Sequence, residues 1–346
     1  MNFSYKKDRV TILIPTHNRH YYLKRILDYY AGQSIAVVVA DSSKKAYTEW
    51  FPAELSVQYY HLPAYGLPAK IEFCLQQIKT PYVVMCADDD FTIPDAVLKC
   101  VDFLEQNKTF AVAQGNALTY RKNKAKQGEI EFTILYKDKL SYTIGDNDPG
   151  KRIEQLLKNY RSIFYAVHDT TNLRFAFEGV STAIQNLYLN EYVTVLPLLK
   201  GCYAELPVLF QVREYAEDSD DKMTTNLDHL LSEEKYSSEV ESFLQFMTKK
   251  ISGCTSEEEQ TVKRRLLDYL NGFAQSITKS RKLSFKKRVG NKIAKLPFVG
   301  NKIIRLNRRL EALKKEDLSA IVRTGIEKAE LDIICSVILN HKEALR

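Results

Sequence analysis

The stretch YVVMCADDDFTIP (82–94) joins a short run of apolar residues directly to three aspartates in a row. The apolar run is typical of a strand buried on both faces, and Pro94 closes the segment. Adjacent carboxylates repel one another unless a cation neutralises them, and oxygen ligands of this kind suit Mg²⁺ or Mn²⁺ bridged to a diphosphate. An acidic surface turn is the usual alternative, but the position directly after a buried strand favours a binding site.

The same alternation of apolar strand and amphipathic helix extends on both sides of this stretch. Strands are predicted over 10–15, 36–41, 57–62 and 82–87. Apolar residues at helical spacing predict helices over 20–32 and 68–78, and another after Pro94. Buried strands that alternate with such helices predict an α/β fold, with a parallel sheet covered on both faces. Ligands bind such sheets beyond the carboxyl ends of the strands.

Polar residues follow the predicted strands at that edge. THNR (16–19) follows the first strand, and Asp41 ends the second. Lys70 lies in the first turn of the helix that begins at Pro68, where free N–H groups and the helix dipole attract phosphate. Taken singly, an aspartate after a strand is more often a turn residue, and such a lysine is more often solvated. Their position at one edge of the sheet favours a nucleotide site.

The sequence pattern changes twice further along the chain. From about residue 110 the strand-like runs are separated by polar loops, and after a polar linker near residue 215 the sequence is helical. The predicted units are a domain over 1–215, with halves 1–110 and 111–215, and a helical region over 216–346.

Composition narrows the classes of function. The 346 residues carry 50 Lys and Arg against 43 Asp and Glu, a net charge of +7 that matters only where it clusters. No apolar run approaches the roughly 20 residues of a membrane span, and no secretory signal is evident. The six cysteines include no CxxC pair, which argues against zinc and thioredoxin-like sites and favours reduced thiols in the cytoplasm. A dehydrogenase is excluded because no GxGxxG sequence is present.

Together these segments resemble the GT-A-fold glycosyltransferases of the large family 2. VTILIPTHNR (10–19) is similar to that family's opening strand and PTYNR-like segment, and VVVADSS (37–43) is similar to its second strand. AKIEFCLQQIKTPYVVMCADDDFTIP (69–94) is similar to the family's ARN-to-DxD stretch. The resemblance covers about residues 8–215. It implies the α/β fold of nucleotide-diphospho-sugar transferases, a Rossmann-like mixed sheet flanked by helices, with an α-helical C-terminal domain added.

The resemblance also implies which residues bind the donor and a metal ion. The donor-binding residues that it implies are Pro15, Thr16, Asn18, Arg19, Asp41, Lys70, Asp88 and Asp89. Asp41 falls where the family's aspartate contacts the base or ribose, and Lys70 falls where an arginine is usual, which keeps the positive charge. The metal-binding triplet has two registers, Ala87-Asp88-Asp89 or Asp88-Asp89-Asp90. Asp89 or Asp90 is expected to hold Mn²⁺ or Mg²⁺, with Asp88 near the ribose.

A third segment implies the catalytic base. NEYVTVLPLLKGCYAEL (190–206) resembles the family's ED segment, a helix that ends in KG before a strand. Counting back from Gly201 places Glu191 on the base, where the family more often has aspartate preceded by glutamate; here Asn190 precedes it. An ordinary first-turn helix acid is the alternative for Glu191. Pro197 is expected to bend this helix, because proline lacks the backbone donor.

The implied reaction is an inverting, metal-dependent transfer of a sugar from a nucleotide-sugar, with UDP as the expected carrier. The acceptor would be a saccharide or a lipid-linked saccharide in bacterial surface polysaccharide synthesis. Glu191 would take the proton of the acceptor hydroxyl, while the cation and Lys70 offset charge on the leaving diphosphate. Two alternatives stay open: a sugar nucleotidyltransferase, which THNRHYYLKR (16–25) disfavours because it lacks glycine, and a non-catalytic module docked to a membrane-associated assembly. For His168 and Asp169, a loop histidine beside a turn aspartate is favoured over a base dyad.

One basic stretch stands apart from the transferase segments. Residues 279–309 contain twelve Lys or Arg and no Asp or Glu, with apolar residues interleaved. This composition is typical of a segment on an anionic membrane surface, so peripheral contact with the inner face of the plasma membrane is one interpretation. A solvated basic face of a helical hairpin packed on the catalytic domain is the other. Nucleic acid is disfavoured, because no RNA-binding motif accompanies the charge.

Overall fold

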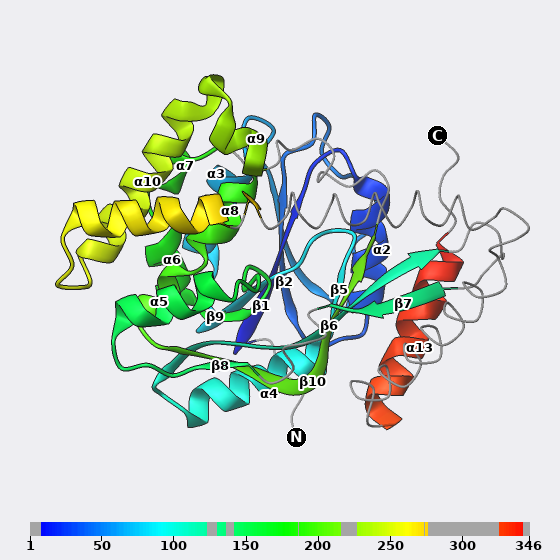
Figure 1. The fold of residues 1–346 in the computed structure, drawn as a ribbon. Helices are drawn as coiled ribbons and strands as arrows, with labels where there is room; N and C mark the ends of the chain where they lie inside the picture. Colours follow the sequence, from blue (N-terminus) through cyan, green and yellow to red (C-terminus); the bar gives the residue numbers. More distant parts are fainter. Residues whose placement is uncertain are drawn as a thin grey trace, which may run out of the picture.

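The computed structural model describes residues 8–122, 130–135, 142–185, 187–215, 227–272, 274–275 and 325–341. These residues form one mixed ten-stranded sheet with helices on both of its faces (Figure 1). The basic stretch 279–309 lies outside the described residues, so the two interpretations of it stay open.

The first half of the sheet is parallel, as the sequence predicts. Its strands, in the order in which they lie side by side, are β3 (Ser56–His61), β2 (Ala36–Asp41), β1 (Val10–Thr16) and β4 (Tyr82–Met85). Thr16 and Asp41 are direct register partners at the carboxyl ends of β1 and β2. The loop with the three aspartates leaves the end of β4, on the other side of β1. The polar residues therefore meet at one edge of the sheet.

The second half of the sheet adds antiparallel strands. Its strands are β9 (Val167–Asp169), β6 (Phe110–Lys122), β10 (Cys202–Glu214), β5 (Phe91–Thr92), β7 (Ile130–Ile134) and β8 (Thr143–Ile144). The short β9 lies between β4 and β6 and is antiparallel to both. Immediately after the aspartates, β5 pairs antiparallel with the last residues of β10. This pairing brings the end of β10 beside the aspartates.

Two helices and the C-terminal helix cover one face of the sheet. They are α2 (His20–Tyr30), α4 (Pro94–Gln106) and α13 (Gly325–Asn340). Ile334 and Ile338 of α13 are fully or almost fully buried in the same core cluster as Ile26 of α2. The ring nitrogen Nε2 of His341 lies 2.9 Å from a carboxylate oxygen of Asp28 in α2. The C-terminal helix α13 thus packs against α2, the helix that follows β1 (Figure 1).

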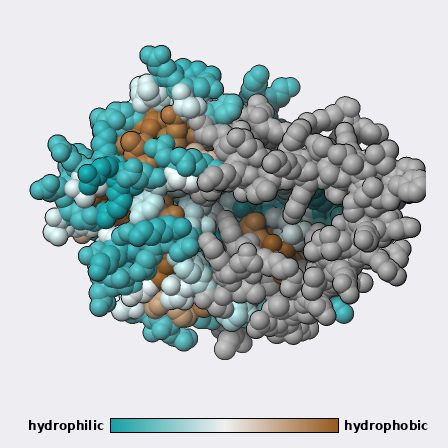
Figure 2. All heavy atoms as spheres, viewed as in Figure 1, coloured by the Kyte–Doolittle hydropathy of each residue, from teal (hydrophilic) through white to brown (hydrophobic). Residues whose placement is uncertain are grey.

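The other helices cover the opposite face and share its core. They are α3 (Leu67–Gln77), α5 (Pro149–Lys158), α6 (Thr170–Phe177), α7 (Val180–Ala183), α8 (Leu187–Val193), the 3-10 helices Leu196–Leu199 and Glu234–Tyr236, α9 (Leu227–Ser232), α10 (Ser237–Ser252) and a helix over 259–272. Phe243 and Met247 of α10 belong to the same cluster as Leu13 and Val83 of the sheet. Hydrophilic residues predominate on the outer surface of these helices, with smaller apolar patches between them (Figure 2). The helical character predicted after residue 227 is confirmed for the described residues within 227–275 and 325–341.

Two local predictions are wrong. The segment around Pro197 is not one bent helix: α8 ends at Val193, and a separate 3-10 helix spans Leu196–Leu199. Pro197 lies in the first turn of that helix, where no backbone donor is needed. His168 does not lie in a loop, because β9 includes Val167, His168 and Asp169.

The described residues contain no helix long and apolar enough to cross a membrane. All six cysteines are free thiols in the structure, and the four that lie in the sheet half of the chain are buried.

Candidate functional site

The turn between β1 and α2 forms the first wall of the site. Asn18 has a left-handed backbone conformation, with φ of 54°, which asparagine tolerates better than most residues. Its backbone N–H donates to Ser43 Oγ over 2.6 Å, and its side-chain oxygen accepts from the Lys44 N–H over 3.1 Å. The turn over Thr16–Arg19 is therefore fastened to the chain that follows β2.

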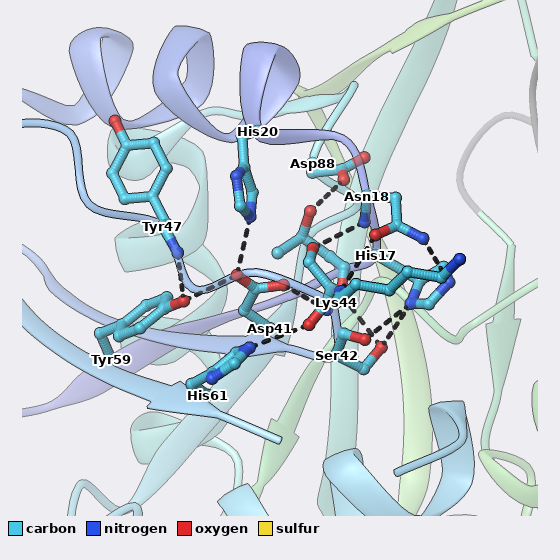
Figure 3. Close-up of polar contacts among 12 residues, drawn as sticks. His17, Asn18, His20, Asp41, Ser42, Lys44, Tyr47, Tyr59, His61 and Asp88 are labelled. Atoms are coloured by element: carbon cyan, nitrogen blue, oxygen red, sulfur yellow. Dashed lines mark hydrogen bonds and ion pairs between the residues drawn. The ribbon is translucent and has the colours of Figure 1, made fainter. Parts of the chain in front are cut away.

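Asp41 is fixed at the end of β2 by several donors. Its Oδ1 accepts from the Ser43 N–H over 2.7 Å, and its Oδ2 accepts from the Tyr59 hydroxyl over 2.7 Å and lies 2.9 Å from His20 Nε2 (Figure 3). The side chain is fully buried. Burial alone would raise the pKa of Asp41, but the hydrogen bonds from Ser43, Tyr59 and His20 outweigh it and lower the pKa. Asp41 is thus an ionised carboxylate with a fixed orientation.

Asp88, Asp89 and Asp90, here called the acid corner, divide between two sets of partners. Thr16 Oγ1 donates to Asp88 Oδ2 over 2.6 Å. Arg19 pairs with both Asp88, over 3.2 Å, and Asp89, over 2.5 Å. Burial raises the pKa of Asp88 above its usual range, against the opposing effect of Arg19. The first two carboxylates therefore face the β1–α2 turn.

Asp90 faces β10 instead. Its Oδ1 accepts from the Glu214 N–H over 3.0 Å, and its Oδ2 accepts from Arg213 Nε over 3.2 Å and from Gln211 Nε2 over 3.4 Å. Burial raises the pKa of this carboxyl too. Both oxygens of Asp90 are engaged by protein donors on the side away from the turn.

Lys70 lies beneath the turn rather than at the surface. Only 3% of the residue is exposed, and its Nζ donates to the Thr16 carbonyl over 2.6 Å and to Ser42 Oγ over 3.1 Å. Its positive charge also acts on Asp88. The solvated interpretation of Lys70 is therefore wrong: it is a buried cation that supports the main chain of the turn.

Glu191 approaches the site from the helical side. It lies in α8, half-buried, and its Oε2 accepts from the Tyr160 hydroxyl over 3.3 Å. The Tyr165 hydroxyl is within electrostatic range of Arg213, Asp90 and Glu191, and desolvation raises the pKa of Tyr165 well above its ordinary value. The Arg213 guanidinium carbon lies 4.8 Å from the ring centre of Tyr165, so Tyr165 is close to the arginine that holds Asp90.

A small cavity adjoins this tyrosine. Its polar lining comprises Gln114, Ser162, Tyr165, Glu205, Gln211 and Arg213. Glu205 is almost fully buried, forms an ion pair with Arg161 and accepts from the Tyr203 hydroxyl over 3.3 Å. Since Gln211 and Arg213 also hold Asp90, the cavity continues from the acid corner toward the second half of the sheet.

His168 and Asp169 do not form a base dyad, and His168 is not in a loop. His168 is fully buried in β9, with Nε2 2.8 Å from the Ile163 carbonyl and no partner for Nδ1. Asp169 caps α6 by accepting from the Asn172 N–H over 3.0 Å. Burial lowers the pKa of His168 to about 4.

This buried histidine predicts a pH dependence of stability. Between pH 6.5 and about 4 the unfolded chain binds a proton that folded His168 does not, so the free energy of unfolding falls as the pH falls through this window. The contribution is at most about 3 kcal/mol. His168→Gln keeps an N–H donor and removes the titration, so its denaturant-unfolding curves should depend less on pH than those of the parent. The exposed His229→Gln is the control, and an unchanged slope in His168→Gln would contradict this account.

A divalent cation such as Mg²⁺ or Mn²⁺ needs several oxygen ligands close together. Among the described residues, no three His, Cys, Asp or Glu side chains are grouped so that they could hold a metal ion. Asp88 and Asp89 nevertheless present carboxylate oxygens to the turn, and oxygen is the ligand that Mg²⁺ and Mn²⁺ prefer. Arg19 is a cation on these same oxygens. Asp88 and Asp89 therefore suit such an ion if it takes the place of Arg19 on their oxygens, whereas the oxygens of Asp90 accept from β10.

Sequence reasoning missed several side chains of the site. His20 and Tyr59, which hold Asp41, and Tyr165 carry no motif in the sequence. The sequence contains a weak indication of Tyr59. If β3 lies parallel and next to β2, the residues near its end lie beside Asp41. Tyr165 had none, since its place depends on how β9 enters the sheet.

The comparisons with known proteins follow this geometry. Residues 11–176 match the family model described as Glycosyl transferase family 2. Among solved structures, residues 1–349 of S. aureus TarS in complex with UDP-GlcNAc are similar, with 13% identity, a TM-score of 0.51, and coverage of 95% of this chain and 90% of that chain. The complex of the same TarS segment with UDP has 14% identity, a TM-score of 0.49, and coverage of 97% and 90%. Against a longer TarS chain, the identity is 13%, the TM-score 0.44, and the coverage 70% of this chain but 44% of that one. No curated protein matches the sequence.

The fold, the acid corner and this family match define a glycosyltransferase with the GT-A fold. Residues 11–176 match glycosyltransferase family 2, which confirms the resemblance found in the sequence.

Proposed function

We propose that the chain transfers a sugar from UDP to a hydroxyl of a saccharide or lipid-linked acceptor, with inversion at the anomeric carbon and with help from a divalent cation. The observation that carries the proposal is the row of Asp41, Thr16 and Asp88 across the ends of β2, β1 and β4. Two strand spacings separate β2 from β4 by about 10 Å, which a nucleoside diphosphate can bridge. A TarS segment of similar fold is described in complex with UDP-GlcNAc, which supports UDP as the carrier.

In this proposal the base and ribose lie over the β1–α2 turn. Pro15 and Thr16 end β1, Asn18 lies in the turn that follows, and the ionised Asp41 lies beside it. The fastening of Asn18 to Ser43 keeps the turn in one shape, so little ordering is needed when a nucleotide binds.

The cation belongs on Asp89 in this proposal, with Asp88 close to the ribose. A bound Mn²⁺ or Mg²⁺ would offset charge on the β-phosphate as it leaves. Arg19 balances both carboxylates from the turn, and Lys70 adds positive charge beneath it. Asp90 is less available to a cation, because both of its oxygens accept hydrogen bonds from the end of β10.

Glu191 is proposed as the base that removes the proton of the acceptor hydroxyl. The Tyr160 hydroxyl orients one of its oxygens, and Glu191 and the acid corner both act electrostatically on Tyr165. A single carboxylate base facing the leaving group across the sugar gives inversion without a covalent intermediate.

Thermal shift with a panel of nucleotide-sugars, with and without Mn²⁺, tests the function. A UDP-sugar should raise the melting temperature only when the metal is added. If no nucleotide-sugar stabilises the chain with Mn²⁺, the enzymatic proposal fails, and the non-catalytic module becomes the better interpretation.

We propose also that the basic stretch 279–309 brings the enzyme to an anionic membrane surface, where a lipid-linked acceptor of a surface polysaccharide would lie. Twelve positive charges interleaved with apolar residues support this. Charge reversal of Lys286, Lys287 and Arg288 should reduce sedimentation with anionic liposomes. Unchanged sedimentation would favour the packed hairpin instead.

A further inference from the structure

A buried arginine reaches the acid corner from α2. Arg25 is fully buried, although it lies in a helix whose other buried residues are apolar or aromatic. Its Nη1 pairs with Glu214 Oε2 over 2.6 Å, and its Nη2 donates to the main-chain carbonyl of Asp89 over 2.7 Å. One guanidinium therefore connects α2, the end of β10 and the middle of the acid corner.

Arg25 belongs to a group of residues linked by hydrogen bonds and an ion pair, here called the Arg25 network. Its members are Arg25, Glu214, Tyr120, Asp89 and Asp90. Glu214 accepts a second hydrogen bond from the Tyr120 hydroxyl over 2.5 Å. The backbone N–H of Glu214 donates to Asp90 Oδ1 over 3.0 Å. The chain from Asp89 to Asp90 is thus held at two points, the carbonyl of the first residue and the carboxylate of the second.

Aromatic rings restrict the guanidinium further. Its Cζ lies 4.9 Å from the ring centre of Tyr22 and 5.1 Å from that of Phe91. The planar guanidinium of Arg25 binds two acceptors and contacts two aromatic rings, so it has little conformational freedom. A lysine ammonium cannot reproduce this geometry.

The energetics argue for a role beyond stability. Taking two charges out of water is costly, and replacing a buried ion pair by apolar residues of similar volume is often neutral or stabilising. A buried pair between Arg25 and Glu214 is therefore weak evidence for stabilisation. What this pair adds, and apolar residues would not, is a directed hydrogen bond to the Asp89 carbonyl.

We propose that Arg25 is a positioning residue that aims the Asp89 carboxylate at the cation site; this inference rests on the proposed function. Fixing the carbonyl of Asp89 fixes the backbone from which its side chain leaves toward Arg19 and the turn. Asp90 stays anchored to β10 without Arg25, because Arg213 and Gln211 hold it independently. Losing Arg25 therefore leaves the corner in place and lets Asp89 turn away.

Two variants and one matched control test the proposal. Arg25→Lys keeps the charge and loses the two-acceptor fork. Arg25→Met combined with Glu214→Leu removes both charges and leaves none unpaired, so at least one variant should fold. Arg152→Lys is the control, because Arg152 is also buried and also donates to main-chain carbonyls, those of Leu198 and Asp146. Urea unfolding establishes that each variant is folded.

The readouts are direct Mn²⁺ binding by electron paramagnetic resonance and UDP binding by calorimetry across a Mn²⁺ titration. The Mn²⁺ concentration for half-saturation should rise at least about tenfold in both Arg25 variants and stay unchanged in Arg152→Lys. UDP binding at saturating Mn²⁺ should recover in Arg25→Lys. An unchanged half-saturation in either folded Arg25 variant overturns the positioning role alone. If the parent chain shows no metal-dependent UDP binding, the proposed function fails, and this inference fails with it.

Discussion

Glu191→Gln should lower the rate of sugar transfer by about 10³-fold while leaving UDP binding unchanged. The amide keeps the size of the side chain and its contact with Tyr160, but it cannot accept the acceptor's proton. The measurement is transfer to an acceptor followed by chromatography, together with UDP binding by calorimetry.

Two further variants make the result specific to Glu191. Tyr160→Phe removes one donor to the carboxylate and should cause a smaller loss of rate. Glu178→Gln changes a side chain that is 74% exposed, and it should transfer sugar at the parent rate. Full activity in Glu191→Gln would return this glutamate to the role of an ordinary helix acid and leave the base to be found elsewhere.

Asp89→Asn should raise the Mn²⁺ concentration needed for half-maximal UDP binding by about 100-fold, and transfer should fall with it. The reason is the loss of the negative charge that faces the β1–α2 turn, where Arg19 is at present its counter-ion. Calorimetric titration of UDP at several Mn²⁺ concentrations gives this number directly.

The neighbouring Asp90→Asn is the matched comparison, because the two residues correspond to the two registers of the metal-binding triplet. Asp90→Asn should lower the free energy of unfolding by about 2 kcal/mol, since the buried carboxylate accepts three hydrogen bonds from the end of β10, and should change Mn²⁺ dependence little. The opposite pattern, with Asp90→Asn losing the metal and Asp89→Asn keeping it, would assign the other register.

The parallel half of the fold and the polar edge could be predicted from local sequence. The strands β1, β2 and β4 are predominantly apolar runs, and each is bounded by a proline or a polar residue within a few positions. Because parallel strands end at one edge, the order of these runs placed Thr16, Asp41 and the acid corner together before any contact was known.

The rest depended on contacts between residues far apart in the sequence. Arg25 and Glu214 are separated by 189 positions, and neither is part of a motif. The same holds for Tyr165, whose position follows from the antiparallel entry of β9 between β4 and β6. Periodicity also could not show that α8 ends before Pro197, since an apolar run continues through the break.

The packing of α13 on α2 sets an order for folding during synthesis. Asp28 and Tyr21 interact with His341, more than 300 positions later, and Tyr29 donates to Glu330. Until α13 has been synthesised, the outer side of α2 is exposed to solvent. Its apolar residues are then accessible to chaperones. The helix α2, which follows the β1 turn of the donor site, therefore gains its full support only after residues 325–341 have been made.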